Sequence, residues 1–345
     1  MLHTIPLSPE PTWQSQLADL VTDPDELLRL LELDAHALPL AEKALRGFPL
    51  RVPRPYLARM EKGNPRDPLL LQVLPVAQED QLSPGFSDDP LGEEQVNTGA
   101  GLLHKYAGRV LLIATSSCAI HCRYCFRRHF PYADNRPGRA QWQGAFDYIA
   151  ARPEIHEVIL SGGDPLACSN NHLQWLLGAL AKLPHVTRLR LHTRLPLMLP
   201  LRVDTPLQQM LHECGKQVVV VLHANHAREF DTEVDAACSR LRVAGAQLLN
   251  QSVLLRGVND DTDSLCALSE RLFAAGVLPY YLHLLDKVRG AAHFDVAEGR
   301  ALALLATLQQ QLPGYLVPRL VREESGQPSK TPVTAVKSAD DGLQY

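Results

Sequence analysis

The sequence predicts an α/β fold built on a parallel sheet, either an open barrel or a doubly wound sheet. After the first strand, the predicted strands start 30, 30, 30 and 32 residues apart, and each interval fits one right-handed strand–helix unit. In both folds, functional side chains are expected at the C-terminal ends of the strands. The six apolar, β-prone segments begin near Arg109, Glu157, Thr187, Gln217, Gln247 and Pro279.

Helical patterns fill the intervals between these strands. Consecutive parallel strands need a crossover long enough to hold a helix, so this alternation favours parallel pairing. The clearest helical patterns cover residues 142–151, 172–183, 229–244 and 264–275.

The first hundred residues differ from the rest. A helix is expected to start after Asp23, with Pro24 in its first turn and Glu26 completing a capping box. Prolines recur too often over residues 49–90 for long helices, so this stretch is expected to form short helices and turns that wrap the core. The acidic, turn-rich residues 87–101 mark a boundary. We therefore expect three regions: a wrapping region (1–98), a barrel (99–318) and a C-terminal tail (319–345).

The composition is that of a globular protein with a buried core. The chain has 345 residues, 46% of them hydrophobic, which excludes global disorder. The net formal charge of −4 argues against a chain that mainly coats nucleic acid or anionic lipid. No apolar run reaches the ~18 residues of a membrane helix, and no signal peptide is visible. We therefore expect a cytoplasmic protein with reduced cysteines.

Three of the seven cysteines form a motif directly after the first predicted strand. Cys118, Cys122 and Cys125 have C-x3-C-x2-C spacing in CAIHCRYC. Three thiolates on one loop can hold three irons of a [4Fe–4S] cluster and leave the fourth iron open to a small molecule. The alternative is a zinc site with a distant fourth ligand such as His121 or His129. It is weaker, because structural zinc sites usually contain two such halves.

A second motif follows the second predicted strand, where residues 161–165 read SGGDP. Gly162 and Gly163 would let the backbone approach a ligand closely. Taken alone, Gly-Gly-Asp is more often an ordinary turn. Its place at a strand end beside the cysteine loop favours a ligand contact that includes Asp164.

The cysteine motif, with the aromatic Tyr124 before its last cysteine, resembles the radical S-adenosylmethionine (SAM) superfamily. The resemblance implies a partial (β/α)6 barrel, a [4Fe–4S] cluster, and SAM bound to the open iron through its amino and carboxylate groups. It also implies reductive cleavage of SAM to a 5′-deoxyadenosyl radical that removes a substrate hydrogen. By the same resemblance, the cofactor contacts include Tyr124, Gly162, Gly163, Asp164 and Gln251.

Longer stretches narrow the resemblance. HKYAGRVLL, CRYCFRRHFPY, NQSVLLRGVND and SKTPV occur in this order and resemble the lysine 2,3-aminomutases. DPDELLRLL, RMEKGNPRDPLL and YYLHLLDKVRGAAHF are similar to the branch that makes (R)-β-lysine for the modification of elongation factor P. The resemblance covers about residues 15–335 and implies pyridoxal 5′-phosphate (PLP) as a further cofactor.

Three cationic residues match the positions that hold PLP in this family. Lys330 matches the lysine that forms a Schiff base with the cofactor, although a tail lysine alone would be taken as surface. Lys105 and Arg109 match residues that hold the phosphate, a doubly charged group that requires cations. The longer aminomutases have arginine in place of Lys105.

The resemblance also implies how the substrate is held. Arg127 matches the residue that binds the α-carboxylate, for which a bidentate guanidinium is suited, while Arg128 is expected to be structural. Asp286 and Glu323 match two acids that receive the ε-ammonium group. An uncharged side chain would leave these acids buried and unpaired. The longer enzymes have aspartate in place of Glu323. His192, at a strand end, is either a supporting residue or a core histidine.

Together these assignments predict an isomerase that converts L-α-lysine to (R)-β-lysine, which a separate ligase attaches to elongation factor P. An electron donor of the flavodoxin or ferredoxin type is expected, and no nucleic-acid or membrane partner. One alternative is a catabolic lysine or glutamate aminomutase. Glutamate is disfavoured because Asp286 and Glu323 would repel its carboxylate. Another is a non-catalytic iron–sulfur adaptor, which would have no use for Lys330.

Overall fold

A nine-stranded sheet lies at the centre of the computed structural model, which describes residues 11–34, 38–93, 101–130 and 139–334. Within these residues the strands follow one another in the order β3 to β11. Strands β4 to β10 are parallel, and β3 and β11 flank them as antiparallel edges. The strands are β3 (Leu102–Tyr106), β4 (Arg109–Thr115), β5 (Glu157–Gly162), β6 (Arg188–Thr193), β7 (Gln217–Leu222), β8 (Gln247–Val253), β9 (Leu278–His283), β10 (Arg319–Arg322) and β11 (Thr331–Pro332).

All six predicted strands form and are parallel, which confirms the α/β class. Four begin at the predicted residue, and β6 and β9 differ by one residue. Strands β3, β10 and β11 were not predicted. Gly108, with φ +75°, makes the turn that folds β3 back onto β4. Strand β10 adds to the parallel sheet beside β9 and β11 pairs with β10, so residues 319–322 and 331–332 of the predicted tail belong to the sheet.

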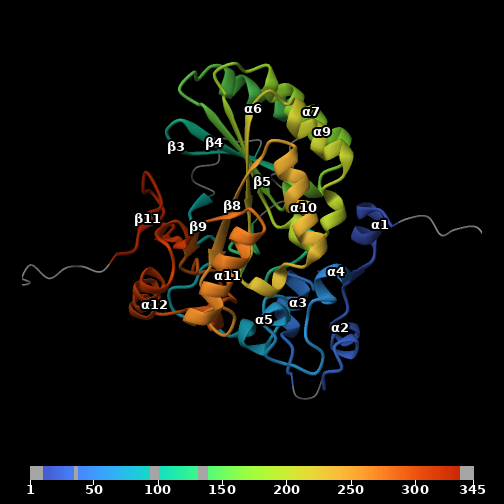
Figure 1. Cartoon of the computed structure of the whole chain (residues 1–345), viewed down its shortest axis with the longest axis vertical. Helices are drawn as coiled ribbons and strands as arrows, with labels where there is room; N and C mark the ends of the chain where they lie inside the picture. Colours follow the sequence, from blue (N-terminus) through green and yellow to red (C-terminus); the bar gives the residue numbers. More distant parts are fainter. Residues whose placement is uncertain (1–10, 35–37, 94–100, 131–138, 335–345) are drawn as a thin grey trace, which may run out of the picture.

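Helices follow the parallel strands and cover the outside of the sheet (Figure 1). Within the described residues, the helix after β7 begins later than predicted, because Asp231 caps it by accepting from the backbone N–H of Val234. Glu229, placed in this helix by the sequence, lies instead in a short 3-10 turn, η6 (Ala227–Glu229). The helix after β7 is α10 (Thr232–Val243), and the other helices of this part are α6 (Arg139–Ala150), α7 (Asn170–Ala181), α8 (Leu195–Met198), α9 (Thr205–Glu213), α11 (Thr262–Ala274) and α12 (Glu298–Gln311), with 3-10 turns η4 (Pro165–Ala167), η5 (Pro200–Arg202), η7 (Ala292–Phe294) and η8 (Gly314–Leu316).

The N-terminal region consists of short elements, as the prolines predict. Asp23 caps α2 by accepting from Asp25 N–H, but the predicted capping box does not form, because Glu26 binds Arg54 instead, at 3.0 Å. The apolar residues of the N-terminal region belong to the same hydrophobic cluster as those of the barrel, so this region packs on the common core. The elements are α1 (Trp13–Ala18), β1 (Leu20–Val21), α2 (Pro24–Leu30), α3 (Glu42–Gly47), β2 (Val52–Pro53), α4 (Arg54–Leu57), α5 (Pro68–Leu71) and η2 (Ala77–Asp80).

The two edges of the sheet approach each other through their side chains. Lys105 on β3 lies 2.6 Å from the carboxylate of Glu323, which directly follows β10. The sheet therefore curls into an open barrel whose interior is a cavity. In the part of the chain that the structure describes, no helix has the length and apolarity to cross a membrane.

Candidate active site

A cavity of about 1300 Å³ brings the predicted site residues together. Cysteines after β4, glycines after β5 and a lysine from the C-terminal segment all reach it, although they lie far apart in sequence. The predicted residues that line it are Lys105, Arg109, Cys118, Cys122, Tyr124, Cys125, Arg127, Gly162, Gly163, Asp164, Gln251, Asp286, Glu323 and Lys330.

The cysteine loop leaves the C-terminal end of β4. Cys118, Cys122 and Cys125 are free, half-buried thiols. Within residues 11–34, 38–93, 101–130 and 139–334, no three or more His, Cys, Asp and Glu side chains are grouped so that they could hold a metal ion. An iron–sulfur cluster has a different requirement, because its thiolates each bind a different iron and do not converge on one metal ion. Three thiols on one loop that lines a cavity are a donor set that suits such a cluster.

The histidines considered for a zinc site have other partners. His121 Nδ1 lies 2.7 Å from the carbonyl oxygen of Pro49, and its ring stacks on Phe48 at 4.3 Å. His129 Nε2 lies 3.2 Å from the carbonyl oxygen of Arg289. Burial lowers the pKa of His121 to about 4. Both rings therefore help to anchor the loop.

The Gly-Gly-Asp segment packs directly on the start of the cysteine loop. A Cβ atom at Gly163 would lie 2.3 Å from the carbonyl oxygen of Ser117, and one at Gly162 would lie 2.5 Å from that of Thr115. Gly163 N–H donates to the same Thr115 oxygen at 2.7 Å. These contacts leave no room for a side chain, so the two glycines let β5 end against the cysteine loop.

Asp164 joins this segment to the end of β6. One carboxylate oxygen accepts from Leu166 N–H and from the Thr193 hydroxyl, at 3.0 and 2.6 Å. The other accepts from the N–H groups of Arg194 and Leu195, at 2.7 and 3.0 Å. All four acceptor positions are used, so the Asp164 side chain positions two strand ends.

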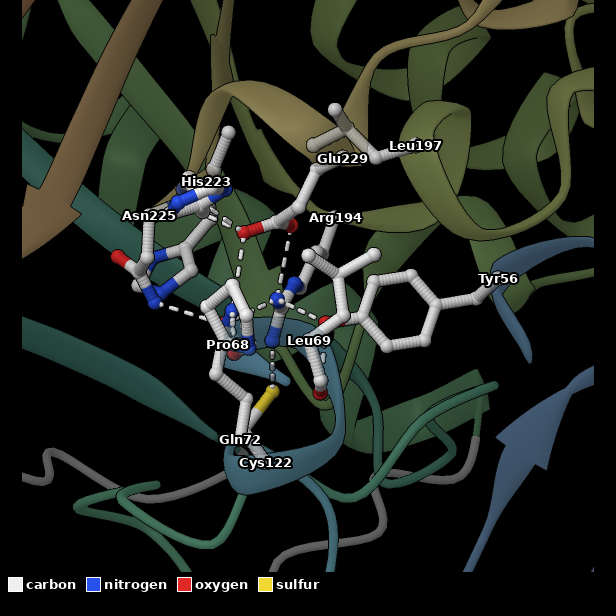
Figure 2. A network of polar contacts seen from close by, with 12 residues as sticks. Tyr56, Pro68, Leu69, Gln72, Cys122, Arg194, Leu197, His223, Asn225 and Glu229 are labelled. Atoms are coloured by element: carbon white, nitrogen blue, oxygen red, sulfur yellow. Dashed lines mark hydrogen bonds and ion pairs between the residues drawn. The ribbon is translucent and has the colours of Figure 1, made fainter. Parts of the chain in front are cut away.

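A buried polar network surrounds Arg194, which follows β6 (Figure 2). Its Nη1 lies 2.8 Å from Cys122 Sγ and 2.8 Å from the Tyr124 hydroxyl. Its Nη2 donates to Glu229 at 2.8 Å and to Gln72 at 2.6 Å. Its Nε is buried and has no hydrogen-bond partner in the described part of the chain. The network thus ties the cysteine loop to β6, to η6 and to the N-terminal region.

Tyr124, the aromatic residue of the cysteine motif, lies inside this network. Its hydroxyl also meets His223 Nε2 at 3.0 Å and Asn225 Nδ2 at 2.7 Å. Its ring stacks on His223 with an angle of 15° between the planes. His223 and Asn225 follow β7, so polar residues beyond the end of that strand reach the same site.

A second buried cluster anchors the cysteine loop to η2. Both oxygens of Glu79 accept from the guanidinium of Arg123, at 2.6 and 2.8 Å. Arg128 donates to Glu79 at 2.6 Å, which confirms its predicted structural role. Glu79, Arg123 and Arg128 are all buried. The N-terminal region therefore helps to fix the loop that carries the cysteines.

Arg127 points into the cavity and binds a carboxylate. Its Nε and Nη2 donate to the two oxygens of Glu93 at 2.7 and 2.6 Å, and its Nη1 donates to the Ser161 hydroxyl at 3.1 Å. This is the bidentate geometry that a planar guanidinium offers to a carboxylate.

Glu323 lies between two lysines in the cavity wall. Lys105 Nζ is 2.6 Å from one of its oxygens and Lys330 Nζ is 2.5 Å from the other, and the Tyr106 hydroxyl donates to it as well. Burial alone would raise the pKa of Glu323, but Lys330 and the hydrogen bonds from Lys105 and Tyr106 lower it to about 2. Glu323 is therefore ionised. Lys330 is three-quarters buried, not a solvated tail residue.

The pKa of Asp286 shifts in the opposite direction to that of Glu323. Burial raises its pKa to about 7, helped by the negative charges of Glu323 and Glu93, while Lys330 opposes the rise. The two predicted substrate acids therefore differ in protonation near neutral pH. Both belong to one electrostatic group with Lys330.

Three further predicted residues complete the wall. Arg109 lies 4.3 Å over the ring of Tyr106, and Gln251 lies on β8. His192 on β6 also lines the cavity, and its Nε2 is buried without a hydrogen-bond partner among the described residues. Burial and the nearby Arg190 and Lys330 lower the pKa of His192, so it is neutral.

Sequence reasoning missed several residues of this site, including Arg194, His223, Asn225, Glu229 and Glu93. A signal existed for three of them. Arg194, His223 and Asn225 directly follow apolar strands, where functional residues of parallel sheets gather. Glu93 and Glu229 have no such position, and only the folded chain brings them to their arginine partners.

Comparison with known proteins identifies the family, although no family model matches the chain. L-lysine 2,3-aminomutase of Escherichia coli (strain K12) is 53% identical over 322 residues, which cover 93% of this chain and 94% of that protein. The enzyme of the same name from Haemophilus influenzae is 48% identical, with 93% and 95% covered. That of Clostridium subterminale is 33% identical, with 93% and 77% covered.

A solved radical SAM methyltransferase from Sphaerobacter thermophilus superposes with a TM-score of 0.45 at 18% identity, covering 64% of this chain and 68% of that one, which is too distant to carry an argument. The sequence relatives carry the conclusion, because they align along nearly the whole chain. The chain belongs to the family of L-lysine 2,3-aminomutases, which are radical SAM isomerases.

Proposed function

We propose that the protein isomerises L-lysine to (R)-β-lysine by moving the α-amino group to C3, and that this product is used to modify elongation factor P. The observation that carries the proposal is the common cavity, which has thiols, a buried lysine and groups for both charged ends of lysine in its wall. The family implies a [4Fe–4S] cluster, SAM and PLP.

The thiols of Cys118, Cys122 and Cys125 would hold the cluster, and Tyr124, Gln251 and the backbone of Gly162 and Gly163 would contact SAM. When bound, the cluster and SAM supply a carbon radical that removes a hydrogen atom, and PLP supplies the ring that assists nitrogen migration. The unpartnered N–H of Arg194 beside the cysteine loop supports a polar group at this place. The residues present therefore fit these groups.

Cationic residues from β3, β4 and the C-terminal hairpin would hold PLP. Lys330 would carry the aldehyde, and Lys105 and Arg109 would bind the phosphate. If Lys105 bound the phosphate and Lys330 the aldehyde, Glu323 would lose both of the cationic partners that it now has. A buried carboxylate without a partner is costly. Glu323 is then available for a new cation.

Lysine matches the charges that remain. Its α-carboxylate would bind Arg127, where Glu93 now offers a carboxylate in the bidentate geometry, and would displace Glu93. Its ε-ammonium would bind Glu323 and Asp286. A glutamate side chain would bring a further negative charge beside the ionised Glu323, which argues against that substrate.

The proposed link to elongation factor P rests on sequence. Stretches such as RMEKGNPRDPLL resemble the branch that serves this modification. We also propose a flavodoxin- or ferredoxin-type electron donor and a cytoplasmic location, consistent with seven free cysteines.

One experiment tests the reaction. Anaerobically reconstituted protein is reduced and incubated with SAM, PLP and L-lysine, and the products are separated on a chiral column. We expect (R)-β-lysine, and its transfer to elongation factor P by a lysyl ligase is then followed by intact mass. Turnover of another amino acid in preference to lysine would refute the substrate. An (S) product, or β-lysine that the ligase rejects, would refute only the link to elongation factor P.

A further inference from the structure

The guanidinium of Arg194 lies between the cysteine loop and a buried carboxylate. Its side chain is 6% exposed, and its Nη1 lies 2.8 Å from Cys122 Sγ. On its other side, Nη2 donates to Glu229, whose side chain is fully buried, at 2.8 Å. Figure 2 shows this sequence of groups, from the sulfur through the guanidinium to the carboxylate.

Glu229 is itself held in place from several directions. Its Oε1 accepts from the N–H groups of Asn225 and His226, at 2.8 and 3.2 Å, and from Gln72 at 3.3 Å. Arg194 also donates to Gln72 and Tyr124. Arg194 therefore cannot turn away from the sulfur or from Glu229, and Glu229 cannot turn away from Arg194, without leaving buried polar groups unpaired.

A fixed cation against a sulfur ligand acts on the electron affinity of a cluster. A reduced cluster carries one more negative charge than an oxidised one, so a hydrogen bond to a ligand sulfur and a nearby positive charge favour reduction. A buried negative charge behind the cation opposes this effect. Both effects are strong here because Arg194 and Glu229 are buried, where the effective dielectric constant is low.

We propose that Arg194 and Glu229 are positioning residues that set the reduction potential of the cluster, with Arg194 donating an N–H···S hydrogen bond to Cys122 and Glu229 limiting its effect. This inference rests on the proposed role of Cys122 as a cluster ligand. It predicts opposite effects for the two residues: loss of the cation lowers the potential, and loss of the anion raises it.

The test is an EPR-monitored redox titration with dithionite on the reconstituted protein. Arg194→Gln is expected to shift the midpoint potential to more negative values, Arg194→Lys to shift it less, and Glu229→Gln to shift it to more positive values. The matched control is Arg202→Gln, because Arg202 is fully buried but donates to the carbonyl oxygens of Leu166 and Cys168. The midpoint potential of the cluster in Arg202→Gln should equal that in the unmodified protein.

Shifts of Arg194→Gln and Glu229→Gln in the same direction, or no shift in either, would overturn the inference, because disruption of packing alone predicts no opposition of sign. If Arg194→Gln fails to fold, Arg194→Lys and Glu229→Gln decide by the same criterion. A separate measurement tests the underlying assignment. If the unmodified protein binds no cluster, or Cys122→Ala keeps the full iron content, the ligand role of Cys122 fails instead.

Discussion

Glu323 and Lys330 face each other across the hairpin that ends the sheet, with 2.5 Å between carboxylate oxygen and amine. The register of β10 and β11 produces this relationship. Val321 pairs with Pro332 and Arg322 with Thr331, so the next position outward places Glu323 opposite Lys330. The last strand pair of the sheet thus delivers an acid and an amine to the cavity together.

Lys330→Ala should abolish covalent attachment of PLP and leave the cluster intact, because the amine comes from the C-terminal hairpin and the cysteines come from the loop after β4. The measurement is borohydride reduction of the PLP-loaded protein followed by peptide mass spectrometry, with iron content determined in parallel. Lys62→Ala is the control, since Lys62 is 63% exposed and pairs with Glu32. An adduct that persists in Lys330→Ala would remove the assignment.

Lysine affinity should rise with pH between about 6 and 8. Burial raises the pKa of Asp286 to about 7, so the empty site holds a protonated acid below that pH, whereas an ammonium ligand favours the carboxylate. Binding near pH 6.5 should therefore release a proton. Calorimetry in two buffers of different ionisation enthalpy measures this release.

Asp286→Asn should abolish the proton release and weaken lysine binding by about ten- to hundredfold, the value of a hydrogen bond to a charged group. SAM affinity is the internal control, because Asp286 belongs to the wall assigned to lysine. An equal loss of affinity for both ligands, or an unchanged pH profile in Asp286→Asn, would contradict the role.

Gly163→Ala should destabilise the protein and reduce its iron content. The added Cβ would meet the backbone oxygen of Ser117 at 2.3 Å, and the cysteine loop would have to move. Gly178→Ala is the matched control, because Gly178 lies within α7 and a Cβ atom added there would have nothing within 4 Å, so this change should stabilise by about 0.5–1 kcal/mol. Thermal unfolding and iron analysis of both variants test this prediction. An iron content of Gly163→Ala equal to that of the unmodified protein would contradict the packing argument.

Glu79→Gln should cost about 3–5 kcal/mol of stability, because it leaves the buried cations Arg123 and Arg128 without their anion. Glu26→Gln should cost below about 1 kcal/mol, since its pair with Arg54 is partly exposed. Urea unfolding of the apoproteins gives both values. Similar costs for the two variants would show that burial does not distinguish the pairs.

Regular patterns made the fold predictable. Each parallel strand from β4 to β9 is a β-prone segment of six or seven residues with apolar side chains at several positions, and the helices between them set a spacing near 30. β10, with four residues and an arginine at each end, carries no such pattern. Its place in the sheet depends on pairing with β9, which the sequence of the tail does not reveal.

The site was predictable where a role belongs to a residue type at a strand end or in a motif. The cysteines were found from their spacing after a strand, and Arg127 and Lys330 from the family resemblance; all of them reach the cavity. The residues that position these side chains could not be predicted, because each such contact joins two distant parts of the chain. Gln72 and Glu229, for example, are 157 positions apart in the sequence and come into contact only in the buried interior of the folded chain.

The ion pair between Lys105 and Glu323 joins residues 218 positions apart. The loop with the three thiols and its supporting residues, from Tyr56 to Glu229, has been translated long before Glu323 and Lys330. During synthesis, the contact between the two edges of the sheet therefore has to wait for the last strand pair. The barrel can close only when almost the whole chain has left the ribosome.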